Sequence, residues 1–293
     1  MVLDCNKPVG IVAGWGHYPV VVAESLRQQN RSVIVAGIRD HASTELQTLA
    51  QAFQWFGVAK LGGYQRFFAR HGVEQVILAG KVFKDRLLFR GLGWMGLAPD
   101  WECIKTFFPH FVLRNRDTRD DSLLNAVVAS FERHGMNIVA GTDIAPQLLI
   151  EEGNLTRLRP TFAMQKDMEF GWDIAKRMGD LDIGQSVTVR DQTILCVEAV
   201  EGTDACIART ASVCPRGGFT LVKVAKPKQD MRFDLPTIGI KTLERLAQAG
   251  GKAILIEAGR TIFLDREQVL QYADRHGIAI VARRDSEVAR KAA

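Results

Sequence analysis

The stretch Val9-Gly10-Ile11-Val12-Ala13-Gly14-Trp15-Gly16-His17-Tyr18-Pro19 decides the fold of the first part of this chain. Its apolar half, residues 9–14, predicts a buried strand, because strands covered on both faces read as continuous apolar runs. Two glycines end the strand, and the apolar spacing of residues 18–29 then predicts a helix. A strand, a glycine turn and a helix in this order are typical of a parallel α/β fold.

The glycine turn is also a candidate binding element. Gly14 and Gly16 let backbone N–H groups approach an anion, and the N-terminus of the following helix adds positive potential. The turn matches a dinucleotide-binding fingerprint only in part, because Pro19 occupies the third glycine position and Asp40 is displaced from the end of the second strand. A nucleotide-sugar oxidoreductase is therefore one alternative function, and a purely structural tight turn is the competing interpretation.

Short apolar runs alternate with helical patterns through the first half of the chain. The expected strands are residues 9–14, 32–38, 75–82 and 137–142, and the expected helices are residues 18–29, 64–71 and 121–134. This alternation predicts a Rossmann-like N-terminal domain, residues 1–146, interrupted by an irregular stretch at about residues 83–119. Residues 147–159 contain Glu151-Glu152-Gly153-Asn154 and are expected to form a linker.

The second half, residues 160–293, predicts a second α/β domain with a mixed sheet. One hairpin is expected from residues 187–190 and 194–200 around Asp191-Gln192. Another is expected from residues 253–258 and 261–265 around Gly259-Arg260. The interleaved helices are expected at residues 166–178, 205–212, 240–249 and 266–276.

Composition sets the outer limits. With 293 residues, of which 47% are hydrophobic, the chain can build a large core and is more naturally two domains than one. No apolar stretch has the length of a bilayer and the N-terminus lacks a signal-peptide pattern, so we expect a cytoplasmic protein. The net charge of +5 favours anionic partners. Five scattered cysteines without a C-x-x-C pair indicate reduced thiols and argue against a zinc site.

The segment of residues 226–239 concentrates charged side chains after a β-branched apolar run. Four of them stand at every second position, and an extended segment would point all four the same way: Lys228, Asp230, Arg232 and Asp234. Two carboxylates between cations suit a phosphorylated ligand that carries a metal ion. A solvated, charged edge strand explains the same pattern equally well.

A second polar turn, Glu201-Gly202-Thr203-Asp204, follows an expected strand and opens a helix that contains Arg209. Helix capping is the simpler interpretation of Thr203 and Asp204. Because this turn and the segment of residues 226–239 both leave strand ends in one domain, they can instead converge on one cleft. The apolar residues 83–101 are read as packed core or as a wall for lipid, and the second reading makes a non-catalytic binder of anionic lipids another alternative.

Several signatures occur in the order of a known family. They are Ile11-Val12-Ala13-Gly14 with Gly16 and Pro19, Asp120-Asp121-Ser122-Leu123-Leu124, Asp182-Ile183-Gly184-Gln185, Val197-Glu198-Ala199-Val200-Glu201-Gly202-Thr203-Asp204-Ala205, the segment from Lys226 to Gly239, and Glu257-Ala258-Gly259-Arg260. Together they resemble the LpxI family of lipid A (lipopolysaccharide) biosynthesis over nearly the whole chain. The resemblance implies a Mg²⁺-dependent hydrolase that cleaves UDP-2,3-diacylglucosamine to UMP and 2,3-diacylglucosamine 1-phosphate.

The resemblance also implies roles for residues. The essential aspartate of the family falls on Asp234, and Asp230 takes a supporting place, so both are expected as catalytic residues and metal ligands. The expected substrate-binding residues are Gly14, Gly16, Thr203, Asp204, Arg209, Lys226, Lys228, Gln229, Arg232 and Thr237. The partner is expected to be a glycolipid nucleotide and not a nucleic acid. Peripheral contact with the cytoplasmic face of the inner membrane is expected from the substrate, and homodimer formation stays open.

Overall fold

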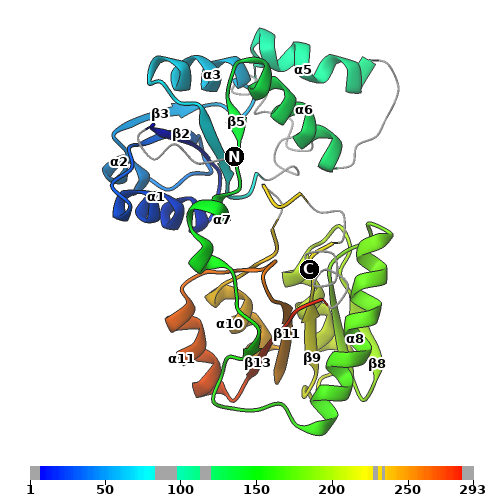
Figure 1. Ribbon diagram of the computed structural model, residues 1–293. Coiled ribbons are helices and arrows are strands. Elements are labelled where there is room, and N and C mark those ends of the chain that lie inside the picture. The colour runs from blue at the N-terminus through cyan, green and yellow to red at the C-terminus, as the bar shows by residue number, and fades with distance from the viewer. Residues whose placement is uncertain (1–6, 83–97, 113–119, 227–229, 233–234, 286–293) are drawn as a thin grey trace. The chain divides into compact units, whose positions relative to one another are not determined.

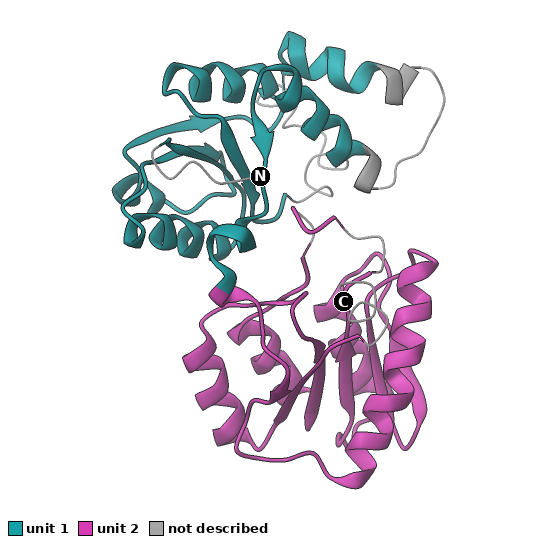
Figure 2. Ribbon diagram, viewed as in Figure 1, with its two compact units in different colours: residues 1–146 teal, residues 147–293 magenta. Residues whose placement is uncertain are grey.

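The computed structural model describes residues 7–82, 98–112, 120–226, 230–232 and 235–285 of the chain (Figure 1). The chain folds into two compact units, Met1–Pro146 and Gln147–Ala293 (Figure 2). The first unit has a parallel sheet and the second a mixed sheet, each flanked by helices. The predicted α/β class, with a parallel sheet followed by a mixed one, is confirmed.

The sheet of the first unit has five parallel strands in the order β3-β2-β1-β4-β5. They are β1 (Val9–Ala13), β2 (Val33–Ile38), β3 (Ala52–Phe56), β4 (Gln75–Ala79) and β5 (Asn137–Ile138). Every residue of β1 and β2 is buried, as their continuous apolar runs predicted. The strand order reverses between β1 and β4, which is where open parallel sheets bind ligands.

Helices cover both faces of this sheet (Figure 1). One group consists of α1 (Tyr18–Gln28), α2 (Leu46–Leu49) and α7 (Gly141–Ile144), and the other of α3 (Leu61–Arg70), α5 (Trp101–Val112) and α6 (Asp120–Arg133). Helix α5 corrects the expectation of an irregular stretch at residues 83–119 for residues 101–112, whereas residues 83–97 and 113–119 lie outside the described residues. Its start is fixed by Asp100, whose carboxylate accepts hydrogen bonds from the backbone N–H groups of Cys103 at 3.0 Å and Gly63 at 2.9 Å.

Two further expectations for the first unit are corrected. Strand β3 was not predicted, because only Phe56 of its five residues is buried at this edge of the sheet and the strand mixes polar with aromatic side chains. Residues 139–142 were expected to continue the last strand, but β5 ends at Ile138 and Gly141 already begins α7.

The sheet of the second unit has the order β6-β13-β11-β9-β7-β8. Its strands are β6 (Gly153–Asn154), β7 (Ser186–Arg190), β8 (Thr193–Val197), β9 (Thr220–Lys223), β11 (Ala253–Glu257) and β13 (Ala279–Arg283). The three central strands β9, β11 and β13 are parallel, whereas β6, β7 and β8 join antiparallel. A separate pair, β10 (Thr237–Ile238) and β12 (Ile262–Phe263), is parallel.

Helix α8 (Phe162–Asp180) covers one face of this sheet, and α9 (Thr203–Val213), α10 (Ile240–Gln248) and α11 (Arg266–His276) cover the other (Figure 1). The first four residues of strand β11 are apolar because they face packed helices on both sides of the sheet. Ala253 and Leu255 pack with the α8 cluster, whereas Ile254 and Ile256 pack with the cluster on the opposite face. Burial of both faces holds the carboxyl ends of the parallel strands at fixed positions.

One expected hairpin of this unit is confirmed and the other is wrong. Strands β7 and β8 pair around Asp191 and Gln192, whose φ angles of 51° and 56° belong to a tight hairpin turn. The hairpin around Gly259-Arg260 does not form, because β11 takes both its neighbours from distant parallel strands and β12 pairs with β10. Local turn residues gave no sign of these long-range pairings.

The segment expected as a linker, residues 147–159, takes part in the second unit. Its strand β6 pairs with β13, and Ile150 is 2% exposed within a core cluster of that unit. Thr156 accepts a hydrogen bond from the backbone N–H of Ile280 at 2.9 Å. Backbone pairing therefore orders this segment despite its charged and glycine-containing sequence.

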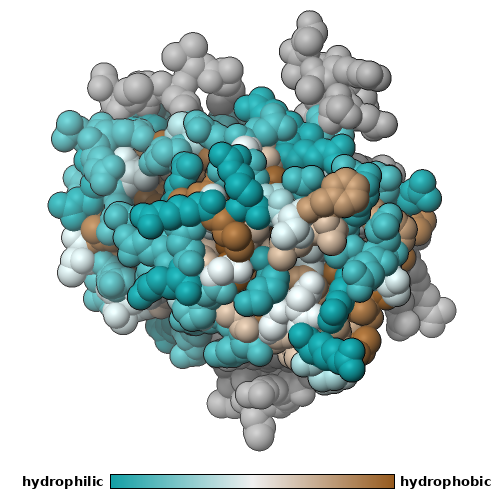
Figure 3. All heavy atoms as spheres, turned by 90° about the horizontal axis from the view of Figure 1, so that it is seen from below, coloured by the Kyte–Doolittle hydropathy of each residue, from teal (hydrophilic) through white to brown (hydrophobic). Residues whose placement is uncertain are grey.

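The surface and the thiols complete the description. In the face shown in Figure 3, apolar side chains occur in small groups among hydrophilic ones. Within the described residues, no helix is both long and apolar enough to cross a bilayer. The four described cysteines, Cys103, Cys196, Cys206 and Cys214, are free thiols in buried positions, as predicted for small core residues.

Candidate active site at the strand ends of the second unit

Charged residues occupy the last positions of the three parallel strands of the second unit. They are Lys223 in β9, Glu257 in β11 and Arg283 in β13. Lys223 is 6% exposed and Glu257 is fully buried, which is costly for charged groups unless they are paired. The carboxyl ends of parallel strands are the usual ligand-binding edge of an α/β sheet. This edge is therefore the candidate active site.

Glu257 lies at the centre of a cluster that we call the Glu257 cluster: Lys176, Glu257, Arg260 and Asp285. The ammonium of Lys176, from α8, donates to both carboxylate oxygens of Glu257 at 2.8 Å and forms an ion pair with Asp285 at 2.8 Å. The guanidinium of Arg260 lies 3.9 Å from Glu257. Two cations thus balance two carboxylates in a largely buried place.

A second cluster joins β9 to the start of α9. The ammonium of Lys223 donates to the hydroxyl of Thr203 at 2.9 Å, and that hydroxyl donates to the carboxylate of Glu198 at 3.1 Å. Asp204, the next residue, forms an ion pair with Arg245 at 2.7 Å. Thr203 and Asp204 are therefore both engaged within the second unit, and Thr203 connects two buried charges. Their predicted contact with substrate stays a prediction.

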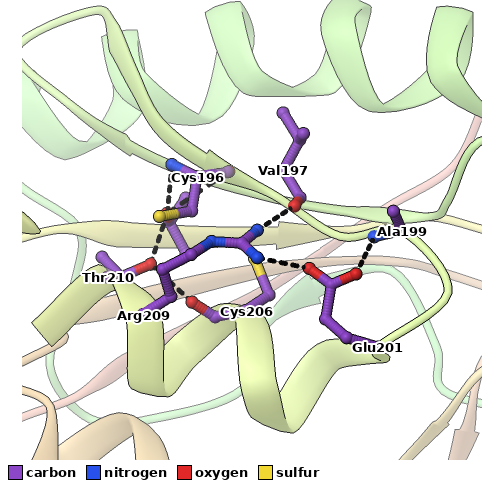
Figure 4. A network of polar contacts seen from close by, with 8 residues as sticks. Cys196, Val197, Ala199, Glu201, Cys206, Arg209 and Thr210 are labelled. Atoms are coloured by element: carbon purple, nitrogen blue, oxygen red, sulfur yellow. Dashed lines mark hydrogen bonds and ion pairs between the residues drawn. The ribbon is translucent and has the colours of Figure 1, made fainter.

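Arg209 forms a separate network between β8 and α9 (Figure 4). Its guanidinium donates to the carboxylate of Glu201 at 2.7 Å and to the backbone oxygen of Val197 at 2.6 Å. Hydrogen bonds with Cys196 and Glu201 raise the pKa of Arg209, and burial raises the pKa of the Cys206 thiol to about 12. Arg209 fixes the loop before α9, so its predicted role in substrate binding would need these bonds to open.

The start of the charged segment lies at the same edge. The ammonium of Lys226 pairs with the carboxylate of Asp182 at 2.6 Å. Thr203 and Lys226 thus lie on connected parts of the strand-end edge, because Thr203 bonds to Lys223 three residues before Lys226. The contact joins the turn before α9 to the strand that leads into the charged segment, and convergence of the two on one cleft stays a prediction.

Asp230 and Arg232 bind one another. The carboxylate of Asp230 accepts the backbone N–H of Arg232 at 2.9 Å, and its guanidinium at 2.7–3.1 Å. The Arg232 guanidinium lowers the pKa of Asp230. An extended segment is wrong here, because Met231 and Arg232 form a turn that the Asp230 carboxylate closes.

Of the other residues of this segment that were predicted to bind substrate or metal, only Thr237 and Lys226 are among the described residues. Thr237 begins β10, and its hydroxyl donates to the backbone oxygen of Leu235 at 3.3 Å. Lys228, Gln229 and Asp234 lie outside the described residues.

Gly14 and Gly16 belong to the first unit, after β1. Gly14 is required by its neighbours, because a Cβ there would lie 2.7 Å from the backbone oxygen of Lys81. Trp15 and Lys81 exchange two backbone hydrogen bonds of 2.8 and 2.9 Å beside it. The structural interpretation of the turn therefore accounts for Gly14. Gly16 has a φ of 110° and a Cβ there would meet no described atom within 4 Å, so its predicted binding role stays open.

Sequence reasoning missed the buried charges of this edge. Lys223 and Glu257 carried a usable signal, since each is a charged residue at the last position of an apolar strand. Lys176 carried none, because its helix pattern is that of a surface lysine and its partner Glu257 lies 81 residues away.

Two α/β units, with charged side chains at the ends of the parallel strands of the second, define the protein as a two-domain α/β protein with a candidate ligand-binding edge. Residues 8–148 match the LpxI N-terminal domain, and residues 151–281 match the LpxI C-terminal domain. A curated relative from Caulobacter vibrioides, "UDP-2,3-diacylglucosamine pyrophosphatase LpxI", is 32% identical over 282 residues, covering 94% of this chain and 97% of the relative. The chain belongs to the LpxI family.

Proposed function

We propose that this protein hydrolyses the pyrophosphate bond of UDP-2,3-diacylglucosamine in lipid A biosynthesis. Water adds to one phosphorus atom, the bond to the bridging oxygen breaks, and UMP and 2,3-diacylglucosamine 1-phosphate are released. The observation that carries the proposal is the match to the LpxI pyrophosphatase along almost the entire length of both chains.

The direct test is incubation of the purified protein with UDP-2,3-diacylglucosamine, followed by mass spectrometry of UMP and the lipid phosphate. Release of both products supports the proposal. Binding of the glycolipid without release of UMP would favour the anionic-lipid binder instead. Thermal stabilisation by NAD would favour the oxidoreductase, although the packing of Gly14 on Lys81 explains that glycine without a nucleotide.

The chemistry proposed for the site starts from charge. A pyrophosphate is an anion, and its cleavage is favoured when cations neutralise the charge that develops on the leaving phosphate. We assign this role to Lys226 and Arg232. In the described arrangement, the side chains of both are held by carboxylates, Asp182 and Asp230 respectively. Exchange of these carboxylates for substrate phosphate would keep the cations paired throughout the reaction.

Dependence on Mg²⁺ is part of the proposal, because a magnesium ion supplies charge neutralisation for phosphoryl transfer. Asp230 is held by Arg232 through both of its carboxylate oxygens in the described arrangement, so a metal ion at Asp230 would share this carboxylate with Arg232 or displace it. Within the described residues, no group of three or more His, Cys, Asp or Glu side chains is arranged to hold a metal ion. Titration of turnover with Mg²⁺ after removal of metal by EDTA tests the dependence.

Asp234 is the proposed catalytic aspartate. We expect Asp234→Ala to abolish release of UMP while the circular dichroism spectrum and melting temperature stay at the wild-type values. Asp173→Ala, which removes an exposed carboxylate from α8, is the matched control and should keep wild-type turnover. A wild-type rate in Asp234→Ala would refute the role of Asp234.

Location and assembly complete the proposal. Because the substrate carries two acyl chains, we propose that the protein works at the cytoplasmic face of the inner membrane through peripheral contact. Flotation with vesicles that contain anionic lipid tests this contact. Light scattering on the purified protein in solution gives its molar mass and decides between a monomer and a homodimer.

A further inference from the structure

The charged segment, residues 226–239, is held near both of its ends by one other stretch of the chain, residues 257–264. At the first end, the carboxylate of Glu257 accepts the backbone N–H of Ala225 at 2.8 Å. The guanidinium of Arg260 donates to the backbone oxygen of Lys226 at 3.4 Å. Two contacts with the Glu257 cluster therefore fix the backbone where the charged segment follows β9.

At the second end, the contacts are hydrogen bonds between backbone groups, whereas those at the first end involve side chains. The N–H of Ile262 donates to the oxygen of Pro236 at 2.8 Å, and the N–H of Leu264 donates to the oxygen of Ile238 at 2.9 Å. These bonds belong to the parallel pair of β10 and β12. Since residues 257–264 connect the two sets of contacts over only a few residues, they fix the distance between the two ends of the charged segment.

The chemistry of the first end is unusual for a purely structural contact. Glu257 is fully buried, and its partner Lys176 has a side chain that is only 14% exposed. A buried ion pair contributes little net stability relative to apolar residues of the same size, but removal of one partner is strongly destabilising. Such a pair makes sense where a defined geometry is required. Here the geometry is that of the segment which carries Asp230 and Arg232.

We propose that Glu257, Lys176 and Arg260 are positioning residues for pyrophosphate hydrolysis. Lys176 holds the carboxylate of Glu257, Glu257 and Arg260 hold the backbone at Ala225 and Lys226, and this contact sets the charged segment in its working position. None of the three needs to touch the reacting atoms. The catalytic part of this inference rests on the proposed function, whereas the structural part can be tested without any substrate.

The test compares the buried Lys176–Glu257 pair, which joins α8 to β11, with an exposed ion pair within α8. Glu257→Gln keeps the shape of the side chain and removes its charge. Glu169→Gln makes the same change in the Lys166–Glu169 surface pair of α8, where the Glu169 side chain is 61% exposed. Turnover of UDP-2,3-diacylglucosamine and hydrogen exchange of backbone amides are measured for both variants and for the wild type.

For Glu257→Gln we expect kcat to fall by roughly 10- to 100-fold with KM changed by less than about threefold, because a small displacement of a reacting group affects turnover more than binding. Amide exchange should rise by about tenfold or more at Ala225, Ile262 and Leu264, and by clearly less in α9 and α10. Glu169→Gln should match the wild type in both measurements.

Arg260→Gln is the second variant, because it leaves the Lys176–Glu257 pair intact and keeps the test open if Glu257→Gln does not fold. It should show the same pattern of kcat and local exchange, and Arg260→Lys should recover part of it. Wild-type kcat in the folded variants, or an equal rise in amide exchange over the whole second unit, would overturn the proposal. If the wild-type protein releases no UMP, the proposed function fails, and the exchange measurement still decides whether these residues hold the segment.

Discussion

Replacement of Thr203 by valine tests whether this residue connects two buried charges. Its hydroxyl accepts a hydrogen bond from the ammonium of Lys223 and donates one to the carboxylate of Glu198. Both charged residues are 6% exposed, so water replaces the lost hydroxyl poorly. Valine keeps the branched shape of threonine, so the change removes these two hydrogen bonds to charged groups, and a longer one of 3.3 Å with the hydroxyl of Ser186, with little effect on packing.

The magnitude follows from these contacts. A hydrogen bond to a charged group contributes about 1.5–3 kcal/mol, so loss of two gives an upper limit of roughly 3–6 kcal/mol. Lys223 keeps other interactions, which lowers the cost. We expect Thr203→Val to reduce the free energy of unfolding by about 2–4 kcal/mol. Thr203→Ser, which keeps the hydroxyl, should cost less than about 1 kcal/mol.

Urea unfolding followed by circular dichroism measures the difference through the shift of the transition midpoint. A second measurement, KM for the glycolipid nucleotide, separates the structural role from the substrate contact predicted by the sequence. If both variants unfold like the wild type and only KM of Thr203→Val rises, Thr203 acts on the substrate and the charge-connecting role is refuted.

Three further predictions concern other positions. Gly184→Ala should lower the melting temperature by several degrees, because the new Cβ would overlap the backbone oxygen of Glu198, at a cost of about 1–3 kcal/mol. Gly239→Ala is its control, since the nearest atom to that Cβ is 3.9 Å away, and an equal loss in both variants would contradict the overlap. Arg232 lowers the pKa of Asp230. The stability that this pair contributes is therefore present above the ordinary pKa of aspartate and is lost as the pH falls through the lowered pKa of Asp230. Carboxyl NMR titration should show that the pKa of Asp230 rises in Arg232→Gln. The Cys206 thiol, with a pKa of about 12, should react with maleimide near neutral pH only after unfolding, and labelling of Cys206 in the native protein, detected by mass spectrometry, would be inconsistent with its burial.

The sequence predicted best those elements whose pattern is set by burial alone. Strands β1 and β2 are apolar on both faces and were predicted as buried strands, and β11 was predicted as a strand, although as one arm of a hairpin. Strand β3 lies at a sheet edge with partly exposed residues, so its pattern is mixed and it was missed. Strand β13 was missed because its short apolar run follows directly on α11.

Strand pairing was predicted well only where it is local. The hairpin of β7 and β8 is closed by two adjacent residues in the left-handed region, and sequence reasoning found it. The hairpin expected around Gly259-Arg260 had a similar local signal but failed. Glycine at position 259 serves a turn with a φ of 71°, whereas the partners of β11 are set by packing between α8 and the helices on the opposite face.

The candidate site shows the same limit in chemical terms. The segment of residues 226–239 was recognised because its charged side chains interrupt an apolar pattern. The residues that hold its first end are buried, and two of them, Lys176 and Glu257, depend on each other across the fold. A buried charged side chain is tolerated only beside an oppositely charged partner. Its role therefore cannot be predicted from its position in the sequence when the partner comes from a distant part of the chain. The exception is the last residue of an apolar parallel strand, where Lys223 and Glu257 both stand. A charged residue at that position lies at the ligand-binding edge because the strand ends there. The apolar run before such a residue is therefore enough to identify the residue as a candidate for the site.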